Sequence, residues 1–324
     1  MNEDVYSLKY ESLKFLRCGN FGSISESRRI VDGRETITKV VTVDSIFGEW
    51  VLCEKQKNRQ IPSEIHFLER LEHPNIIKFI EYFQTKTSFI IVTEKRNSGI
   101  DLFEFINKQP KLEEKLTAHI FSQVLSAVAY LHSRNILHGD IKEENVVIDR
   151  SLNCVLIDFG SSAYFGPDVA FSSYSGSPQC ICPEVLRREI FRGPEQEVWC
   201  LGVLLYTLLH FDYPFHSDND ILNSNLVFNE EISQDMQEVL LKCLHPIAVC
   251  RPAVSYLANV DLFKQPIELN LYTFYDIFDA DINVETIKAN TGQGTSYEKC
   301  SSTCTSDDDL NTFYANSFLA NILL

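Results

Sequence analysis

The side chains with the clearest chemistry lie in the middle of the chain, in the run His138-Gly139-Asp140-Ile141-Lys142-Glu143-Glu144-Asn145. A second short motif, Asp158-Phe159-Gly160, follows it. Carboxylate and amide oxygens are the ligands that Mg²⁺ prefers, so we expect Asn145 and Asp158 to hold a magnesium ion against phosphate. Asp140 is then free to accept the proton of a hydroxyl group, and Lys142 can neutralise charge on a phosphoryl group in transit. The alternative is that the first motif is a turn that occurs by chance. The presence of the second motif at this distance along the chain argues against that alternative.

The elements that must position these motifs change character along the chain. From residue 11 to 93, short β-branched runs predict strands at 36–41, 76–80 and 89–92, with one helix over 62–71 among them. Asn97-Ser98-Gly99 is a candidate boundary, because these residue types favour turns. Beyond it, the apolar spacing predicts a long helix over 116–131, and the apolar run 199–209 predicts a buried one. Both motifs fall between these two helices, beside short strands predicted at 146–148 and 155–157.

Taken together, the motifs resemble those of eukaryotic protein kinases, and the resemblance extends over residues 11–265. The form Asp140-x-Lys142-x-x-Asn145 is similar to the serine/threonine branch. The runs 98–103, 156–164 and 192–195 resemble the catalytic domain of PAS-domain-containing kinases. Only about ten residues precede this region in the sequence, so we expect no sensor domain here.

The resemblance implies an α+β, bilobal protein-kinase-like fold, with a small, mainly β N-lobe carrying one helix and a larger, mainly α C-lobe. Its implied layout is an N-terminal extension at 1–10, the N-lobe at 11–96, the C-lobe at 97–265 and an acidic Ser/Thr-rich tail at 266–324. The implied reaction transfers the γ-phosphoryl group of ATP, with Mg²⁺, to protein Ser or Thr hydroxyls. The tail is predicted to be flexible over 285–309, and 310–324 is either a docking helix or a frayed terminus.

The resemblance also assigns roles to residues. Lys39 would bind the α- and β-phosphates and pair with Glu64, and Thr93 would be the gatekeeper before a hinge at 94–96. Asp101 and Glu144 would favour substrates with basic residues, and Ser177 would lie nearest the substrate hydroxyl. The full set of implied nucleotide contacts is Gly19, Phe21, Gly22, Ile24, Lys39, Glu64, Thr93, Glu94, Arg96 and Asp101.

Three positions depart from the family pattern. Arg17 stands where the phosphate loop usually has its first glycine, so a stiffer or displaced loop is expected. Gly139 replaces an Arg that normally meets a phosphate on the activation segment, so phosphorylating 158–184, with Ser173 the most typical site, should matter little. Glu197 stands where an Asp usually orders the catalytic loop. These departures leave a rival open, a pseudokinase scaffold that binds nucleotide without turnover; a small-molecule kinase is a lesser alternative.

Composition excludes several function classes. The 324 residues carry 29 basic and 45 acidic side chains, a formal charge of −16, which disfavours nucleic acid and suits cationic peptide substrates. The longest apolar stretch, 198–209, is too short for a membrane helix of about 20 residues. With an acidic N-terminus that is no secretory signal, the chain is expected in the cytoplasm, with the nucleus as a second location. The ten cysteines are expected to be reduced and lack zinc spacing, and no pattern specifies an oligomeric state.

Overall fold

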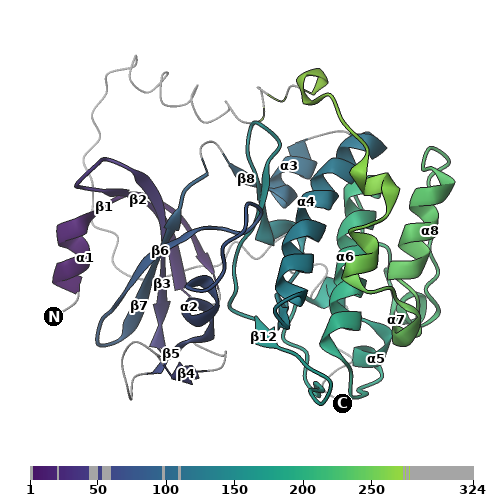
Figure 1. Cartoon of the computed structure of the whole chain (residues 1–324), viewed down its shortest axis with the longest axis horizontal. Coiled ribbons are helices and arrows are strands. Elements are labelled where there is room, and N and C mark those ends of the chain that lie inside the picture. The colour runs from purple at the N-terminus through teal and green to yellow at the C-terminus, as the bar shows by residue number, and fades with distance from the viewer. Residues whose placement is uncertain are drawn as a thin grey trace. The chain divides into compact units, whose positions relative to one another are not determined.

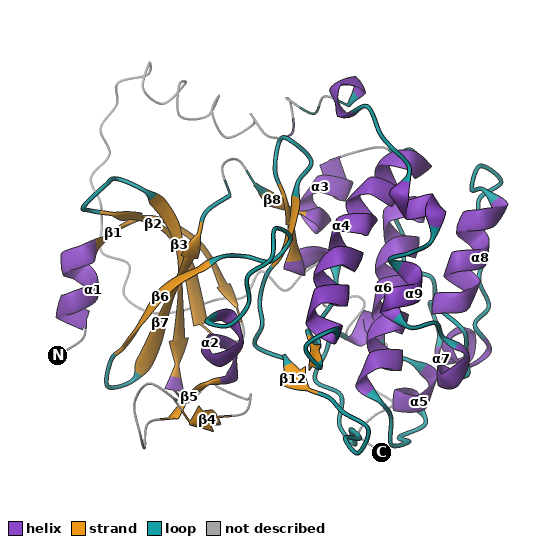
Figure 2. Cartoon of the chain, viewed as in Figure 1, coloured by secondary structure: helices purple, strands orange, loops and turns teal. Residues whose placement is uncertain are grey.

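Strands dominate the first part of the chain and helices the second (Figures 1 and 2). The computed structural model describes residues 3–19, 22–43, 50–52, 60–96, 99–108, 111–272, 274 and 277. The predicted flexible tail at 285–309 and the segment 310–324 lie outside these residues. Within the described part, the five-stranded sheet lies before residue 97 and the long helices follow residue 99.

The N-terminal sheet has five antiparallel strands in the order β1-β2-β3-β7-β6. Their bounds are β1 Tyr10–Gly19, β2 Gly22–Arg29, β3 Glu35–Thr42, β6 Phe79–Gln84 and β7 Ser88–Glu94. Side chains alternate between the two faces of a strand, and in the central strand β3 this separates Thr36 and Thr38 from Lys39. The two threonines are buried and hydrogen-bond to Ser27 Oγ at 2.8 and 2.7 Å. Lys39 therefore projects from the opposite face of the sheet.

A short helix that the apolar pattern did not indicate, α1 (Glu3–Lys9), packs on the outer face of this sheet. The rings of Tyr6 and Tyr10 stack at 5.5 Å, and both meet the edge of Phe83. Tyr6 Oη also lies 3.0 Å from Thr38 Oγ1. The first residues therefore add to the core of the strand-rich part.

On the other side of the sheet lies α2 (Ser63–Leu68), whose six residues are all buried. It follows the small hairpin of β4 (Trp50–Leu52) and β5 (Gln60–Pro62). The helix predicted over 62–71 is thus present but shorter, because the chain turns after Leu68. The strand predicted at 76–80 begins later, at Phe79, since Ile76 makes an isolated bridge to Leu156 instead.

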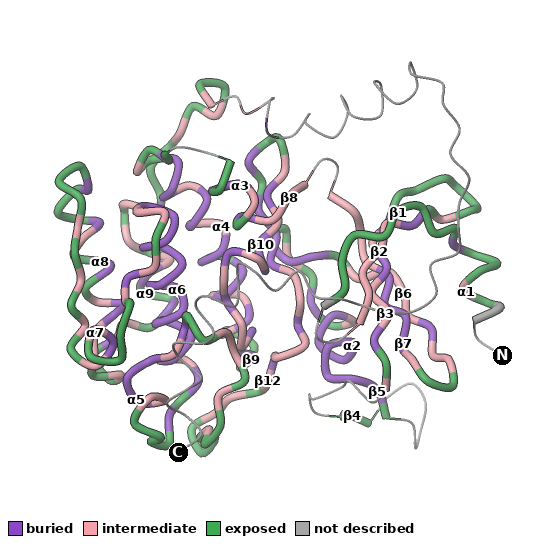
Figure 3. The backbone as a smooth tube through the Cα atoms, turned by 180° about the vertical axis from the view of Figure 1, so that it is seen from behind, coloured by how far each residue is buried: buried purple, intermediate pink, exposed green. Residues whose placement is uncertain are grey.

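The second part is built around two buried helices (Figure 3), α4 (Glu114–His132) and α6 (Gly193–His210). The predicted stripe of α4 is at most 2% exposed, and α6 is buried continuously from Gln196 to Leu209, as their patterns indicated. Around them lie α3 Leu102–Lys108, α5 Pro183–Leu186, α7 Asp218–Asn223, α8 Gln234–Cys243 and α9 Val254–Leu257. None of the described helices is both long and apolar enough to cross a membrane.

Five short strands line the edge of the helical part that faces the sheet domain. β8 (Ile100–Asp101), β10 (Val146–Ile148) and β11 (Cys154–Leu156) form one sheet, and β9 (Ile136–Leu137) pairs with β12 (Ala163–Tyr164). The first chemical motif follows β9 directly, and the second follows β11 after one residue. The bilobal α+β fold is therefore the one expected.

Candidate active site

The loop after β9 is held by one carboxylate on α6. Glu197 Oε1 accepts the backbone N–H groups of His138 and Gly139 at 2.7 and 2.9 Å, and its Oε2 accepts from His132 Nε2 at 2.6 Å. Burial alone would raise the pKa of Glu197, but the hydrogen bond and charge of His132 lower it below the ordinary value. Glu197 therefore orders the loop as an ionised group, the role expected of the shorter Asp.

Gly139 fits this loop for a steric reason. Its φ is +85°, and a Cβ atom there would lie 2.2 Å from the backbone oxygen of Ser161. The backbone of the later motif thus passes where a side chain would begin. An arginine at this position would require the two segments to separate.

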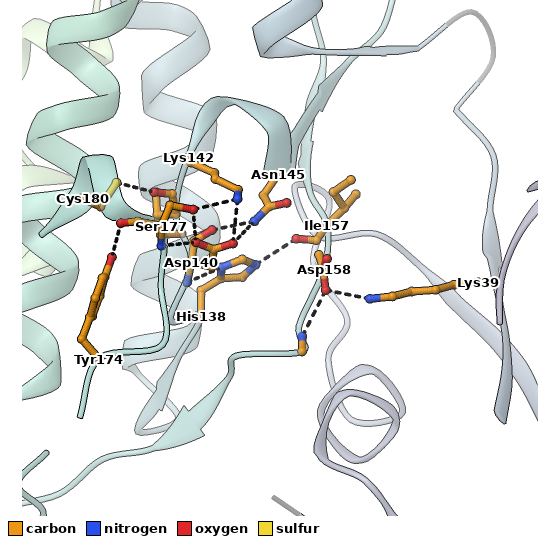
Figure 4. Close-up of polar contacts among 12 residues, drawn as sticks. Lys39, His138, Asp140, Lys142, Asn145, Ile157, Asp158, Tyr174, Ser177 and Cys180 are labelled. Carbon is orange, nitrogen blue, oxygen red and sulfur yellow. Dashed lines mark hydrogen bonds and ion pairs between the residues drawn. The ribbon is translucent and has the colours of Figure 1, made fainter. Parts of the chain in front are cut away.

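Asp140 lies at the centre of the hydrogen-bond network drawn in Figure 4. Its Oδ1 accepts from the backbone N and the Oγ of Ser177 at 3.0 and 2.8 Å, and its Oδ2 accepts from Asn145 Nδ2 at 2.8 Å. Lys142 Nζ lies 3.2 Å from Oδ2 and donates to Ser177 Oγ at 2.7 Å. A carboxylate and an ammonium group therefore converge on a seryl hydroxyl.

Lys39 connects the two parts of the chain. Its Nζ donates to Glu64 at 2.8 and 3.0 Å and to Asp158 Oδ1 at 2.8 Å. Burial alone would lower the pKa of Lys39, but the two carboxylates raise it above its ordinary value. For a carboxyl group, burial acts in the opposite direction and raises the pKa. At Asp158 the effect of Lys39 is larger, and the pKa falls below its ordinary value. At Glu64 burial outweighs Lys39, and the pKa rises. The expected pair of Lys39 and Glu64 is present, with Asp158 as a third member.

The donor set fits Mg²⁺ bound together with phosphate. Asn145 Nδ2 donates both of its hydrogen bonds to Asp140, so the amide oxygen is left for a ligand. Asp158 uses Oδ1 for Lys39 and the N–H of Gly160, and its side chain is 27% exposed. No group of three or more His, Cys, Asp or Glu side chains suited to a metal occurs among the described residues. Asn145 and Asp158 thus offer two hard oxygen donors. This suits Mg²⁺, whose remaining ligands would be phosphate oxygens and water.

The predicted phosphate loop includes the end of β1 and the start of β2. Gly19 pairs with Gly22, whose φ is +146°, and a Cβ at residue 22 would lie only 1.7 Å from the Val40 oxygen. Ile24 pairs with Lys39 in the sheet, and Phe21 lies outside the described residues. Arg17, at the position of the missing glycine, extends to the other lobe, where its Nη1 lies 3.9 Å from Asp101 Oδ2.

Several other predicted contacts have partners within the protein. Thr93 pairs with Ile37 in β3. Glu94 forms ion pairs with Arg96 at 3.4 Å and Arg34 at 3.9 Å, so its carboxylate is engaged within the protein. Asp101 Oδ1 accepts the N–H of Glu104 at 2.8 Å at the start of α3, a structural role that the sequence reasoning missed.

The acidic side of the site extends beyond Asp140. Burial and the neighbouring Glu143 raise the pKa of Glu144. Glu143 itself is buried and accepts a hydrogen bond from Tyr213 Oη at 2.6 Å. The pairing of a buried Glu with a distant Tyr has no local signal, and the sequence analysis did not single out either residue.

The sequence matches known proteins along most of its length. The protein kinase domain family matches residues 10–263. The PAS domain-containing serine/threonine-protein kinase of Mus musculus is 35% identical over 276 residues, 85% of this chain and 20% of that protein. The serine/threonine-protein kinase ppk6 of Schizosaccharomyces pombe is 35% identical over 72% of this chain and 31% of its own length. The serine/threonine-protein kinase pim-2 of Danio rerio is 32% identical over 79% and 84%. The chain thus spans between a fifth and a third of the first two relatives.

Proposed function

Because this chain belongs to the protein kinase family, with a catalytic domain of the serine/threonine type, we propose that it transfers the γ-phosphoryl group of Mg·ATP to Ser or Thr hydroxyls of proteins. The observation that carries the proposal is the convergence of Asp140 and Lys142 on the hydroxyl of Ser177. A substrate hydroxyl that displaced Ser177 would meet the same two groups.

The roles of the chain's own residues follow from their contacts. Asp140 accepts the proton of the attacking hydroxyl as a general base, held in place by Asn145. Lys142 holds the hydroxyl and balances negative charge beside it. Lys39, fixed by Glu64, orients the nucleotide, and Asn145 and Asp158 hold the metal. ATP supplies the phosphoryl group, and Mg²⁺ neutralises its phosphate charge.

We also propose that the enzyme works without phosphorylation of the segment 158–184. Unmodified contacts support this: β12 pairs with β9, Phe171 bridges to Phe191 with stacked rings 5.8 Å apart, and Tyr174 Oη donates to the Ser177 carbonyl at 3.1 Å. Ser173 is exposed. Because residue 139 is a glycine, it provides no guanidinium group that could bind a phosphate on this segment.

The proposed substrates carry basic residues close to the target hydroxyl. The support is electrostatic, since Glu144 and Asp101 lie in the same lobe as Asp140 and the chain carries a formal charge of −16. Charge of one sign near a site raises the local concentration of oppositely charged ligands.

The test is radiolabelled phosphate transfer from Mg·ATP to a mixture of basic and neutral Ser/Thr peptides. Asp140→Asn should lower turnover by about 10²- to 10⁴-fold, the usual contribution of a general base, with ATP affinity unchanged. Asp235→Asn, the same change at an exposed position on α8, should keep native turnover. If the native chain binds ATP but transfers no phosphate, the chain is a nucleotide-binding scaffold and the proposal fails.

A further inference from the structure

The position of Glu64 depends on a very short helix. α2 has six residues, and helices shorter than about 12 residues are marginal without tertiary support. If α2 moved away, Lys39 would lose the carboxylate that holds it. The contacts that fix α2 therefore decide whether the nucleotide site is assembled.

One of these contacts comes from the start of the activation segment. His66 Nε2, on α2, and Tyr164 Oη, on β12, form a hydrogen bond of 3.0 Å. The Tyr164 ring also lies against Phe67, with centroids 5.0 Å apart, and meets the His66 ring at 5.9 Å. Two consecutive side chains of α2 thus contact a single tyrosine.

Tyr164 is itself tied to the catalytic loop. It pairs with Ile136 in β9, and the next residue, Phe165, donates its N–H to the Asn135 carbonyl at 2.9 Å. β9 leads directly into the loop that carries Asp140. A continuous path of contacts therefore runs from the catalytic loop through Tyr164 and His66 to Glu64.

This path uses no phosphate. At residue 139, where an Arg would bind a phosphorylated segment, the backbone of Ser161 excludes a side chain. The hydrogen bond between Tyr164 and His66 supplies a connection without phosphate between the same segment and α2. Tyr164 is 49% exposed, whereas its hydrogen-bond partner His66 is only 6% exposed.

We propose that Tyr164 and His66 are positioning residues that hold α2 where Glu64 meets Lys39, so that the nucleotide site stays assembled without phosphorylation. The proposal rests on the proposed kinase function and concerns the regulation of that same site.

The test removes the hydroxyl and leaves the ring. Tyr164→Phe should lower kcat/KM for ATP by about two- to tenfold, the range expected for one neutral hydrogen bond, and should weaken ATP binding to a similar extent. Tyr256→Phe is the matched control: that tyrosine is 52% exposed and its hydroxyl accepts from Lys242 Nζ at 3.4 Å on a distant helix. It should leave both quantities unchanged.

Two further variants separate positioning from folding. His66→Gln keeps a hydrogen-bonding side chain and should retain more activity than His66→Leu, and adding Tyr164→Phe to His66→Leu should cause no further loss. Amide hydrogen exchange supplies a readout independent of activity. The Glu69 N–H, bonded to the Ile65 carbonyl at 3.0 Å at the end of α2, should exchange faster in Tyr164→Phe than in Tyr256→Phe.

Native kcat/KM and native exchange in Tyr164→Phe would overturn the proposal. A lower melting temperature with unchanged ATP affinity would also overturn it, because the contact would then be only structural. If the native chain transferred no phosphate, the proposed function would fail, while exchange and ATP binding would still decide the role of Tyr164.

Discussion

Glu197 offers a direct test of how the catalytic loop is held. Its side chain is 2% exposed and accepts three hydrogen bonds, two of them from the backbone N–H groups of His138 and Gly139. Glu197→Ala would leave both N–H groups without an acceptor, at about 1–3 kcal/mol each, beside a new cavity. We expect a loss of about 3–5 kcal/mol in the free energy of unfolding. Turnover should also fall, since the two amides lie next to Asp140.

Glu197→Gln separates the charge from the shape. The amide retains an acceptor, but charge-assisted bonds are roughly twice as strong as neutral ones, so we expect a loss of about 1–2 kcal/mol at pH 7. Because the folded state lowers the pKa of Glu197, its ionic contribution is complete above the ordinary glutamate value of about 4.3. That contribution disappears as the pH falls through the lowered pKa. The difference between native and Gln proteins should therefore shrink by pH 4.

Urea unfolding of the native, Ala and Gln proteins at pH 7 and pH 4 measures these differences. Glu238→Ala is the control: that side chain is 65% exposed and pairs with Lys242 on α8 at 2.7 Å, so it should change stability by less than about 1 kcal/mol. A Glu197→Ala protein within 1 kcal/mol of native at pH 7, taken as roughly the limit for a surface residue, would refute the reasoning.

Three further predictions concern other parts of the chain. Arg251→Met should reduce the free energy of unfolding by about 3–5 kcal/mol, because it leaves Glu184, now bonded at 2.6 and 2.8 Å, as an unpaired and nearly buried charge; a urea curve close to native would contradict this. Ser173→Ala should keep most of the phosphate-transfer activity, and a collapse of turnover would show that the segment needs its phosphate. Arg17→Gly breaks an ion pair whose side chains are 45% and 26% exposed, so its melting temperature should change little. Because the change frees Asp101, KM for an arginine-containing peptide should fall by up to about fivefold, with a neutral peptide unaffected; equal changes for both peptides would exclude competition.

The two central helices and the catalytic loop could be predicted from the sequence because their determinants are local. The stripe of α4 and the apolar run of α6 are repeats at helical spacing, and burial followed that pattern. Asp140, Lys142 and Asn145 lie within six residues, so their spacing alone brings their side chains into one network.

Other features depended on contacts that no local pattern encodes. α2 was predicted too long because its apolar spacing continues past the point where the chain turns. α1 was missed because its single tyrosine, Tyr6, meets Tyr10 and Phe83 only once the sheet has formed. Arg17 was expected to stiffen or displace its loop, and its contact with Asp101 could not be predicted because it depends on the second lobe.

The sequence by itself determined the family, the local motifs, and the strands and helices with a clear periodic pattern, such as β3, β7, α4 and α6. Only the tertiary structure decided the contacts that no spacing implied: Asp158 as a third partner of Lys39, His66 with Tyr164, and the three hydrogen bonds by which Glu197 holds its loop. The physical reason is that a hydrogen bond depends on the placement of two backbones to within a few tenths of an ångström. That placement is set by the packing of the whole core and not by the spacing of residues along one segment.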